Sequence, residues 1–245
     1  MANKAIISLS GGLDSTCLLL KLLSEGYEVK SYSFKYGQKH SIELDKVKKN
    51  IKLLKEKGFK LEHQIIDLTD VFSDSVSSLC EGNGEIPKGD EYNETNISST
   101  VVENRNVIFS AIIYGKALSW ANKTKENVVI TQGVHAGDHF TYPDTRPESV
   151  NMAKELYRIS NIGSERVDFI APFVDIDKTA VLTIGMKSMK KMGLTDDEMT
   201  EILRNTHSCY EPDQLGRSCG ACATCIERKQ AFNLNGMIDP IEYVN

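Results

Sequence analysis

The sequence predicts an α/β fold, a Rossmann-like sheet of five parallel strands with helices on both faces. Short apolar runs of four to six residues alternate with longer segments of helical periodicity, and such alternation favours parallel strands joined by crossover helices. A glycine pair, Gly11 and Gly12, directly follows the first apolar run. No Pro/Gly/Ser-rich linker divides the chain, so we expect residues 1–245 to form one domain.

The first elements follow from local composition. Residues 5–9 are almost entirely apolar, which predicts a short buried strand. Residues 10–15 hold the glycine pair and predict a turn. Residues 16–23 repeat leucine at helical spacing and end near Gly26. Residues 29–34 are the second predicted strand.

The next segment is a long charged helix over residues 41–57, closed by Gly58. Residues 61–66 are the third predicted strand. Residues 67–104 then break the alternation, because they are polar, contain three glycines and one proline, and lack a clear period. A loop of this length in a compact domain is usually functional or disordered.

The second half resumes the pattern. Residues 106–120 predict a helix with an apolar face and residues 128–131 a fourth strand. Residues 133–147 are irregular and rich in His, Asp and aromatic residues. The remaining predicted elements are a helix over 148–160, a fifth strand over 167–170, and helices over 177–192 and 195–204.

Composition argues against two classes of partner. The net charge of -5 provides no global basic field for nucleic acid. No run approaches the roughly 18 consecutive apolar residues of a membrane span, and the first residues lack the apolar helix and cleavage site of a signal peptide. We therefore expect a cytoplasmic protein without a membrane partner or a direct nucleic-acid partner.

Residues 10–15, Ser-Gly-Gly-Leu-Asp-Ser, have the features of a phosphate-binding loop. The glycines permit a close backbone approach, the following helix presents free N–H groups and a positive dipole end, and Ser10 and Ser15 can donate hydroxyls. The segment is neither a Walker A loop nor a G-x-G-x-x-G loop. The alternative is a plain strand-to-helix turn that uses glycine only for its geometry.

Four of the six cysteines crowd into residues 209–225, whereas Cys17 and Cys80 are isolated. In a cytosolic chain such clustering indicates a metal site, and four sulfurs complete a closed, structural Zn²⁺ shell. We place this site in segment 205–229, with ligands Cys209, Cys219, Cys222 and Cys225. The alternative is an iron–sulfur cluster of ferredoxin type, which expects Cys-Pro after the third cysteine, where Ile226 and Glu227 stand.

The loop at residues 10–15 matches the S-G-G-x-D-S motif of PP-loop ATP pyrophosphatases, and further segments resemble one family within that class. FKYGQKH at 34–40 is similar to D-Y-G-Q-R-H, and TVVENRN at 100–106 is similar to T-V-V-P-N-R-N. GVHAGDH and YPDTRPE, at 133–139 and 142–148, are similar to G-V-H-A-G-D-H and Y-P-D-C-R-P-E. These segments, together with Asp177-Lys178-Thr179 and the T-x-S-C-Y lead at 206–210, resemble the 7-cyano-7-deazaguanine synthase (QueC) family over essentially the whole chain.

The resemblance implies a ligase that forms C–N bonds while cleaving ATP to AMP and pyrophosphate. Family members convert 7-carboxy-7-deazaguanine and ammonia to 7-cyano-7-deazaguanine, a precursor of queuosine. A carboxylate is a poor electrophile, so one adenylation would yield the amide and a second, on the amide oxygen, would yield the nitrile. The resemblance further implies ATP as cosubstrate, Mg²⁺, structural Zn²⁺ and a homodimer.

The resemblance also implies roles for individual residues. Those assigned to catalysis are Asp14, Ser15, Arg105 and Lys178, with Asp14 also on Mg²⁺. Those assigned to ATP are Ser8, Leu9, Ser10, Gly11, Gly12, Leu13, Asp14, Ser15, Thr16, Cys17 and Leu18. Those assigned to the substrate are Tyr36, Gln38, Arg105, Asn106, His135, Asp138, Asp144 and Arg146. For Arg105 the alternative is a surface cation, and for Lys178 a solvated residue that opens a helix. His135 and His139 are expected to contact ligand from a loop rather than to bind metal.

Three positions depart from the family pattern. Glu103 stands in place of Pro, Thr145 in place of Cys, and Ser149 where an aromatic residue is common. These departures leave open a relative that adenylates the same acid but joins it to another amine, such as a peptide or protein amino group. Two further alternatives are a PP-loop enzyme that modifies tRNA directly and a zinc module that binds nucleotide without turnover.

Overall fold

The computed structural model describes residues 3–88, 97–138 and 142–244. Its centre is a five-stranded sheet in the order β3-β2-β1-β4-β5, and every neighbouring pair is parallel. The strands are β1 (Lys4–Ser8), β2 (Glu28–Lys35), β3 (Leu61–Asp67), β4 (Val128–Thr131) and β5 (Val167–Ile170). The predicted fold class is confirmed, and β4 and β5 have the predicted bounds.

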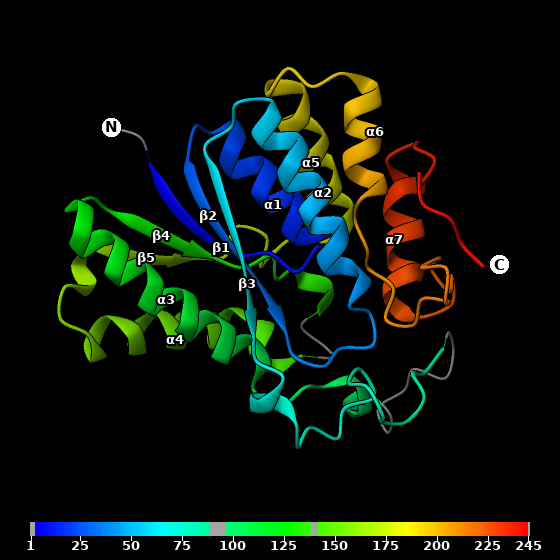
Figure 1. Cartoon of the computed structure of the whole chain (residues 1–245), viewed down its shortest axis with the longest axis horizontal. Coiled ribbons are helices and arrows are strands. Elements are labelled where there is room, and N and C mark those ends of the chain that lie inside the picture. The colour runs from blue at the N-terminus through cyan, green and yellow to red at the C-terminus, as the bar shows by residue number, and fades with distance from the viewer. Residues whose placement is uncertain (1–2, 89–96, 139–141, 245) are drawn as a thin grey trace.

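Helices cover both faces of this sheet (Figure 1). On one face α1 (Leu13–Ser24) and α2 (Ile42–Glu56) pack on the strands, and α5 (Lys178–Lys191), α6 (Asp196–Arg204) and α7 (Ala223–Leu234) complete the same core behind them. The other face packs against α3 (Arg105–Thr124) and α4 (Pro147–Ser160). Short 3₁₀ turns occupy the connections, at Asp70–Phe72, Ile97–Thr100, Ala136–Asp138, Pro143–Thr145 and Ser164–Arg166.

The alternation of side chains along β1 explains the two cores. Ala5 and Ile7 pack with the α1 side of the sheet, whereas Ile6 packs with the α3 side, and all three are fully buried. Successive residues of a strand point to opposite faces, so a strand covered on both sides is apolar at nearly every position. This is why the apolar runs at 5–9 and 128–131 identified central strands.

The structure differs from the prediction in two helices. Helix α1 begins at Leu13 rather than residue 16, because Gly12 is its N-cap and already has extended backbone angles. Asp14 and Ser15 therefore lie in the first helical turn. Helix α7 was not expected at all. Its 12 residues, ATCIERKQAFNL, lack a continuous apolar stripe, so the segment reads from sequence as a tail after the cysteines.

The long segment after β3 is anchored to the end of β2. Lys39 N donates to Leu79 O at 2.9 Å and Glu81 N to Gly37 O at 2.8 Å, and Leu79 and Cys80 are buried.

Among the described residues, no helix is both long and apolar enough to cross a membrane.

Candidate active site

The carboxyl ends of β1, β2 and β4 open onto a cavity of about 190 Å³. Ser8 lines it from the end of β1, Phe34 and Tyr36 from the end of β2, and Gln132 and Gly133 from the residues after β4. Ligands of open α/β sheets bind at this edge, outside the carboxyl ends of the strands. The cavity thus lies where the fold places binding sites.

One end of the cavity is the loop between β1 and α1. Gly11 has φ +96°, and a Cβ there would lie 2.7 Å from both Glu43 O and Val47 Cγ2, so the tight turn requires glycine. Gly12 gives α1 no side-chain cap, which leaves the helix N-terminus available to an anion. The hydroxyls of Ser10 and Ser15 are 3.0 Å apart and line the cavity. This arrangement fits phosphate oxygens.

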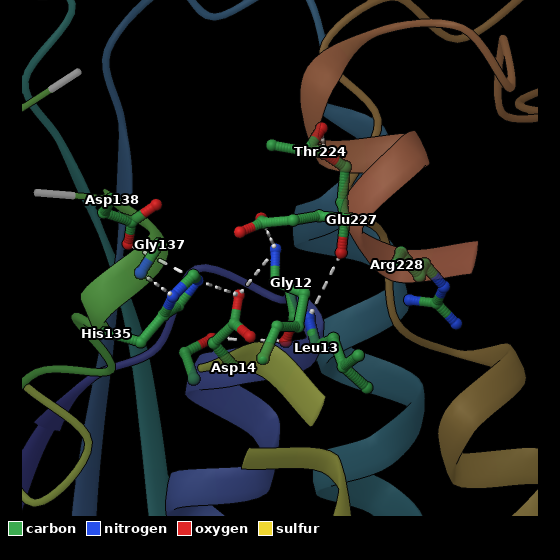
Figure 2. A network of polar contacts seen from close by, with 12 residues as sticks. Gly12, Leu13, Asp14, His135, Gly137, Asp138, Thr224, Glu227 and Arg228 are labelled. Atoms are coloured by element: carbon green, nitrogen blue, oxygen red, sulfur yellow. Dashed lines mark hydrogen bonds and ion pairs between the residues drawn. The ribbon is translucent and has the colours of Figure 1, made fainter. Parts of the chain in front are cut away.

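A charged network lies beside the loop (Figure 2). The Asp14 carboxylate is 3.5 Å from Lys178 Nζ and 3.7 Å from His135 Nε2, and His135 Nε2 is 3.6 Å from Asp138. Glu227, on α7, accepts a 2.8 Å hydrogen bond from Lys178 Nζ. Residues from α1, α5, α7 and the segment after β4 therefore meet at one point.

Lys178 is held as a buried cation. Lys178 is only 4% exposed. Burial by itself lowers the pKa of its ammonium group, but the nearby carboxylates of Asp14, Glu227 and Asp138 outweigh burial and raise the pKa above its ordinary value. Burial raises the pKa of Asp138. Lys178 thus carries a fixed positive charge beside the loop at residues 10–15, the part of the cavity that is called the phosphate end below.

The opposite part of the cavity is aromatic. Phe34 and Phe109 stack with ring centroids 4.0 Å apart, and the hydroxyls of Tyr142 and Tyr210 are 3.1 Å apart. All four residues line the cavity. Flat rings with a few hydroxyls suit a planar heterocycle, because they supply stacking area together with hydrogen-bonding groups.

Arg105 projects into this aromatic part. Its Nη1 donates to the Tyr36 hydroxyl at 3.0 Å, and its guanidinium carbon lies 5.5 Å from the Tyr36 ring centroid. Burial raises the pKa of Tyr36 to about 12, so the hydroxyl stays neutral. Among the described residues, Tyr36 is the acceptor with which the guanidinium pairs, which leaves further N–H groups for a carboxylate or phosphate.

Several residues assigned from the resemblance lie away from the cavity. Gln38 is 1% exposed and fixes the end of β2, since it accepts from Tyr36 N and donates to Phe34 O and Glu43 Oε1. Asp144 accepts from Asn106 N and Nδ2, so Asn106 lines the cavity and Asp144 supports it from behind. Arg146 is exposed at the start of α4.

The side chains assigned to ATP divide into two groups. The cavity is lined by Ser8, Leu9, Ser10, Gly12, Asp14 and Ser15. The remaining five do not line it: Gly11 is in the turn before α1, and the buried residues Leu13, Thr16, Cys17 and Leu18 belong to the inner face of α1. His135 is 1% exposed and supports Asp14 and Asp138 from behind the wall. His139 lies outside the described residues.

Three further residues at the site had no functional assignment from sequence. Glu43 and Gln132 line the cavity, and Glu227 reaches Lys178 from 49 positions along the chain. Glu43 sits in a charged helix, and Glu227 follows the last cysteine, so neither stands out by composition. Gln132 directly precedes the G-V-H-A-G-D-H segment at residues 133–139, and this position is the one feature of the sequence that could have indicated its role.

The four clustered cysteines meet in space. Their Sγ atoms all lie within 4.8 Å of one another. Cys209 Sγ accepts backbone N–H bonds from Glu211 and Cys219 at 3.3 and 3.2 Å, and Cys219 Sγ accepts one from Cys222 at 3.3 Å. Backbone N–H groups aimed at sulfur stabilise thiolates, the form that binds metal. The donor set fits one tetrahedral ion.

The cysteine cluster is joined directly to the phosphate end. Cys222 is the N-cap of α7, and Thr224 in the first turn donates to Ser208 O at 2.6 Å. Ser208 Oγ in turn lies 3.5 Å from Leu13 N. A metal held by the cluster would therefore fix the start of α7, and with it Glu227, against the loop after β1.

The parallel sheet, the S-G-G-x-D-S loop and the cavity define a PP-loop protein. A family model described as "Queuosine biosynthesis protein QueC" matches residues 4–236. A 7-cyano-7-deazaguanine synthase of Caldicellulosiruptor saccharolyticus is 38% identical over 240 residues, covering 98% of this chain and 95% of that protein. One of Marinomonas sp. is 35% identical over 243 residues, covering 99% of each, and one of Pseudoalteromonas atlantica is 36% identical over 244 residues, covering 99% and 100%. The chain therefore belongs to the QueC family.

Two of the departures from the family pattern differ in their relation to the site. Thr145 is 2% exposed, lines the cavity and donates to Tyr142 O at 2.7 Å. Glu103 is exposed, accepts from Ser75 Oγ at 2.6 Å and does not line the cavity. Thr145 is consequently the departure that is positioned to affect a bound substrate.

Proposed function

We propose that this chain converts 7-carboxy-7-deazaguanine and ammonia to 7-cyano-7-deazaguanine by two rounds of adenylation, each releasing AMP and pyrophosphate. Membership of the QueC family supports this reaction. The observation that carries the proposal is a single cavity that joins the loop at residues 10–15 to an aromatic compartment containing Arg105. ATP and a planar acid would there lie side by side.

The proposed roles follow from position. Ser10, Ser15 and the N-terminus of α1 hold the phosphates of ATP. Arg105 holds the carboxylate of the acid through its free N–H groups. Lys178, fixed by Asp14 and Glu227, stabilises the negative charge that develops as pyrophosphate leaves.

The acid oxygen attacks the α-phosphorus, which forms an acyl adenylate and releases pyrophosphate. Ammonia then replaces AMP at the carbonyl carbon and gives the amide. The amide oxygen is adenylated in its turn, and loss of AMP with the remaining amide protons leaves the nitrile. Because both rounds transfer AMP to an oxygen on the same carbon, one phosphate loop serves both.

Two metals belong to the proposal. Asp14 would hold Mg²⁺, since its Oδ1 is buried without a hydrogen-bond partner among the described residues, and the ion would neutralise charge on the phosphates of ATP. Cys209, Cys219, Cys222 and Cys225 would hold a structural Zn²⁺, which contributes folding energy. We also propose a homodimer, on the family resemblance alone, which light scattering would test.

A second candidate function is a ligase that joins the adenylated acid to another amine, such as a peptide amino group. This candidate is retained because Thr145, which departs from the family pattern, lines the cavity where it would face a bound substrate. The two are separated by supplying ¹⁵N-ammonium, a peptide amine, or both, together with Mg-ATP and the acid. Formation of ¹⁵N-nitrile supports the first function. AMP formation that requires the peptide supports the second, and no acid-dependent AMP formation with either amine refutes both.

A further inference from the structure

One wall of the cavity is polar and belongs to neither the phosphate end nor the aromatic part. It consists of His40, Glu43 and His207, all of which line the cavity and are at most 7% exposed. Glu43 lies in the first turn of α2, where its Oε1 accepts from Gln38 Nε2 at 3.1 Å and lies 3.7 Å from His40 Nε2. A buried carboxyl group thus lines the cavity beside the His40 imidazole, and His207 lines the same cavity.

This wall lacks a cation. Among the described residues, no lysine or arginine lies within ion-pair distance of Glu43, whose one such contact is His40; Arg105 acts on the Glu43 carboxyl only from further away and lowers its pKa less than burial raises it. Burial lowers the pKa of His40 to about 3, so its ring is neutral, and burial raises the pKa of Glu43 to about 8. Without a paired cation, burial therefore favours the neutral form of Glu43, and a small bound cation would stabilise its carboxylate form.

The wall also has unused hydrogen-bonding atoms. Within the described part of the chain, His40 Nδ1 and both ring nitrogens of His207 are buried and without a partner. Buried polar atoms in folded proteins are nearly always paired. Each neutral imidazole offers one acceptor nitrogen, and together with the Glu43 carboxyl these acceptors suit a ligand that is small, polar and able to donate several hydrogen bonds.

The wall adjoins the phosphate loop. Glu43 O lies 2.7 Å from the position of a Cβ on Gly11, so the first turn of α2 touches the loop. His207 N donates to Gly11 O at 2.8 Å. In an acyl adenylate, one oxygen joins the carbonyl carbon to the phosphorus of AMP. If this phosphorus is held beside the loop, a nucleophile bound at the wall lies next to the carbonyl carbon that it attacks.

We propose that Glu43, with His40 and His207, binds the ammonium ion that donates the nitrogen, and that the Glu43 carboxylate takes the first proton from it. This inference rests on the proposed function and identifies the subsite for its amine. Ammonium gives one proton to Glu43 and becomes ammonia. The nitrogen lone pair forms the C–N bond as the C–O bond to AMP breaks, and the second proton leaves on the AMP phosphate. Ammonium has no carbon substituent to place and four N–H donors, which suits a buried set of acceptors.

The test is Glu43→Gln, which keeps the size of the side chain and removes its charge and its basicity. Glu56→Gln, on the exposed last turn of the same helix, is the matched control. Two rates are measured for each protein. Acid-dependent exchange between pyrophosphate and ATP reports adenylation without any amine, and ammonium-dependent amide and nitrile formation reports the amine step.

We expect Glu43→Gln to fold, as judged by its thermal unfolding, and to retain acid-dependent exchange within a few-fold. Its product formation at subsaturating ammonium should fall by roughly 100-fold, the usual size of a lost general base, with a higher KM for ammonium and an unchanged KM for the acid. Glu56→Gln should match the unsubstituted chain in both rates. This pattern supports the ammonium subsite.

Two outcomes would overturn the inference while leaving the proposed function intact. One is an unchanged KM and rate for ammonium in Glu43→Gln. The other is a loss confined to the KM for the acid and to exchange, which would assign Glu43 to the N–H groups of the deazaguanine ring. If the unsubstituted chain shows no acid-dependent exchange, the proposed function fails, and the inference fails with it.

Discussion

Replacing Asp239 with Ala would remove the carboxylate that pairs with the fully buried Arg228 on α7. The two side chains are 8% and 0% exposed. Arg228 Nε and Nη2 donate to the two Asp239 oxygens at 2.7 and 3.0 Å, and its remaining bonds go to Thr206 Oγ1 and Leu203 O at 2.7 and 3.2 Å. The guanidinium thus ties α7 and the C-terminal segment to the end of α6.

The expected cost is large because the substitution leaves a buried cation uncompensated. Breaking one partner of a buried ion pair typically destabilises a protein by about 3–5 kcal/mol. Asp239 also accepts a 2.6 Å hydrogen bond from the Tyr243 hydroxyl, which would be lost as well. For a chain of this size, each kcal/mol corresponds to roughly 2–4 °C in Tm, so Asp239→Ala should lower Tm by roughly 6–20 °C.

The assay is thermal unfolding for Tm and urea unfolding for the free energy, both followed by circular dichroism on protein supplemented with zinc, with Glu155→Ala as the control. Glu155 pairs with Arg158 on α4, where both side chains are more than half exposed, and such pairs contribute at most about 1 kcal/mol. A loss of stability for Asp239→Ala that is no larger than that of the control would refute the reasoning.

Three further predictions concern the metal, the phosphate loop and one buried acid. Elemental analysis should find about one zinc per chain, and Cys222→Ser should lose both zinc and stability, since structural metal binding is folding energy; iron with sulfide would contradict the zinc assignment. Asp14→Ala and Ser15→Ala should abolish ATP turnover without unfolding the chain, whereas ADP as a product of the unsubstituted protein would exclude PP-loop chemistry. Because burial raises the pKa of Glu43 from 4.5 to about 8, its contribution to stability is present below pH 4.5 and is lost as the pH rises through 8. Glu43→Gln, neutral throughout, should therefore gain stability relative to the unsubstituted protein between pH 5 and pH 9, by up to a few kcal/mol; a difference that does not vary with pH in urea titrations would contradict this.

The sheet was predictable because its signal is local. The runs at 128–131 and 167–170 are short and largely apolar, and their bounds as strands were predicted correctly. The sequence places the start of α1 too late, because the glycine pair predicts a turn over residues 10–15, whereas the chain becomes helical immediately after Gly12. In the same way, Leu13 and Cys17 lie within or beside the motif but face the core, since successive helical residues point in different directions.

The site was only partly predictable because its contacts join distant segments. Nothing near Lys178 in sequence indicates that Glu227 would pair with it. Gln38 belongs to a motif that resembles the family, yet its amide is used to fix the end of β2. Glu43 is one acidic residue among several on a charged helix, and only the packing of α2 against the phosphate loop brings it to the cavity.

The proposed function requires one site to activate the same carbon twice. The most direct measurement is the ratio of AMP to product when the protein is incubated with Mg-ATP, 7-carboxy-7-deazaguanine and ammonium, with products identified by mass spectrometry. We expect 7-cyano-7-deazaguanine with two AMP released for each nitrile, because the acid and the amide each lose one oxygen. Accumulation of the amide with one AMP, or AMP formation that does not depend on the deazaguanine acid, would contradict it.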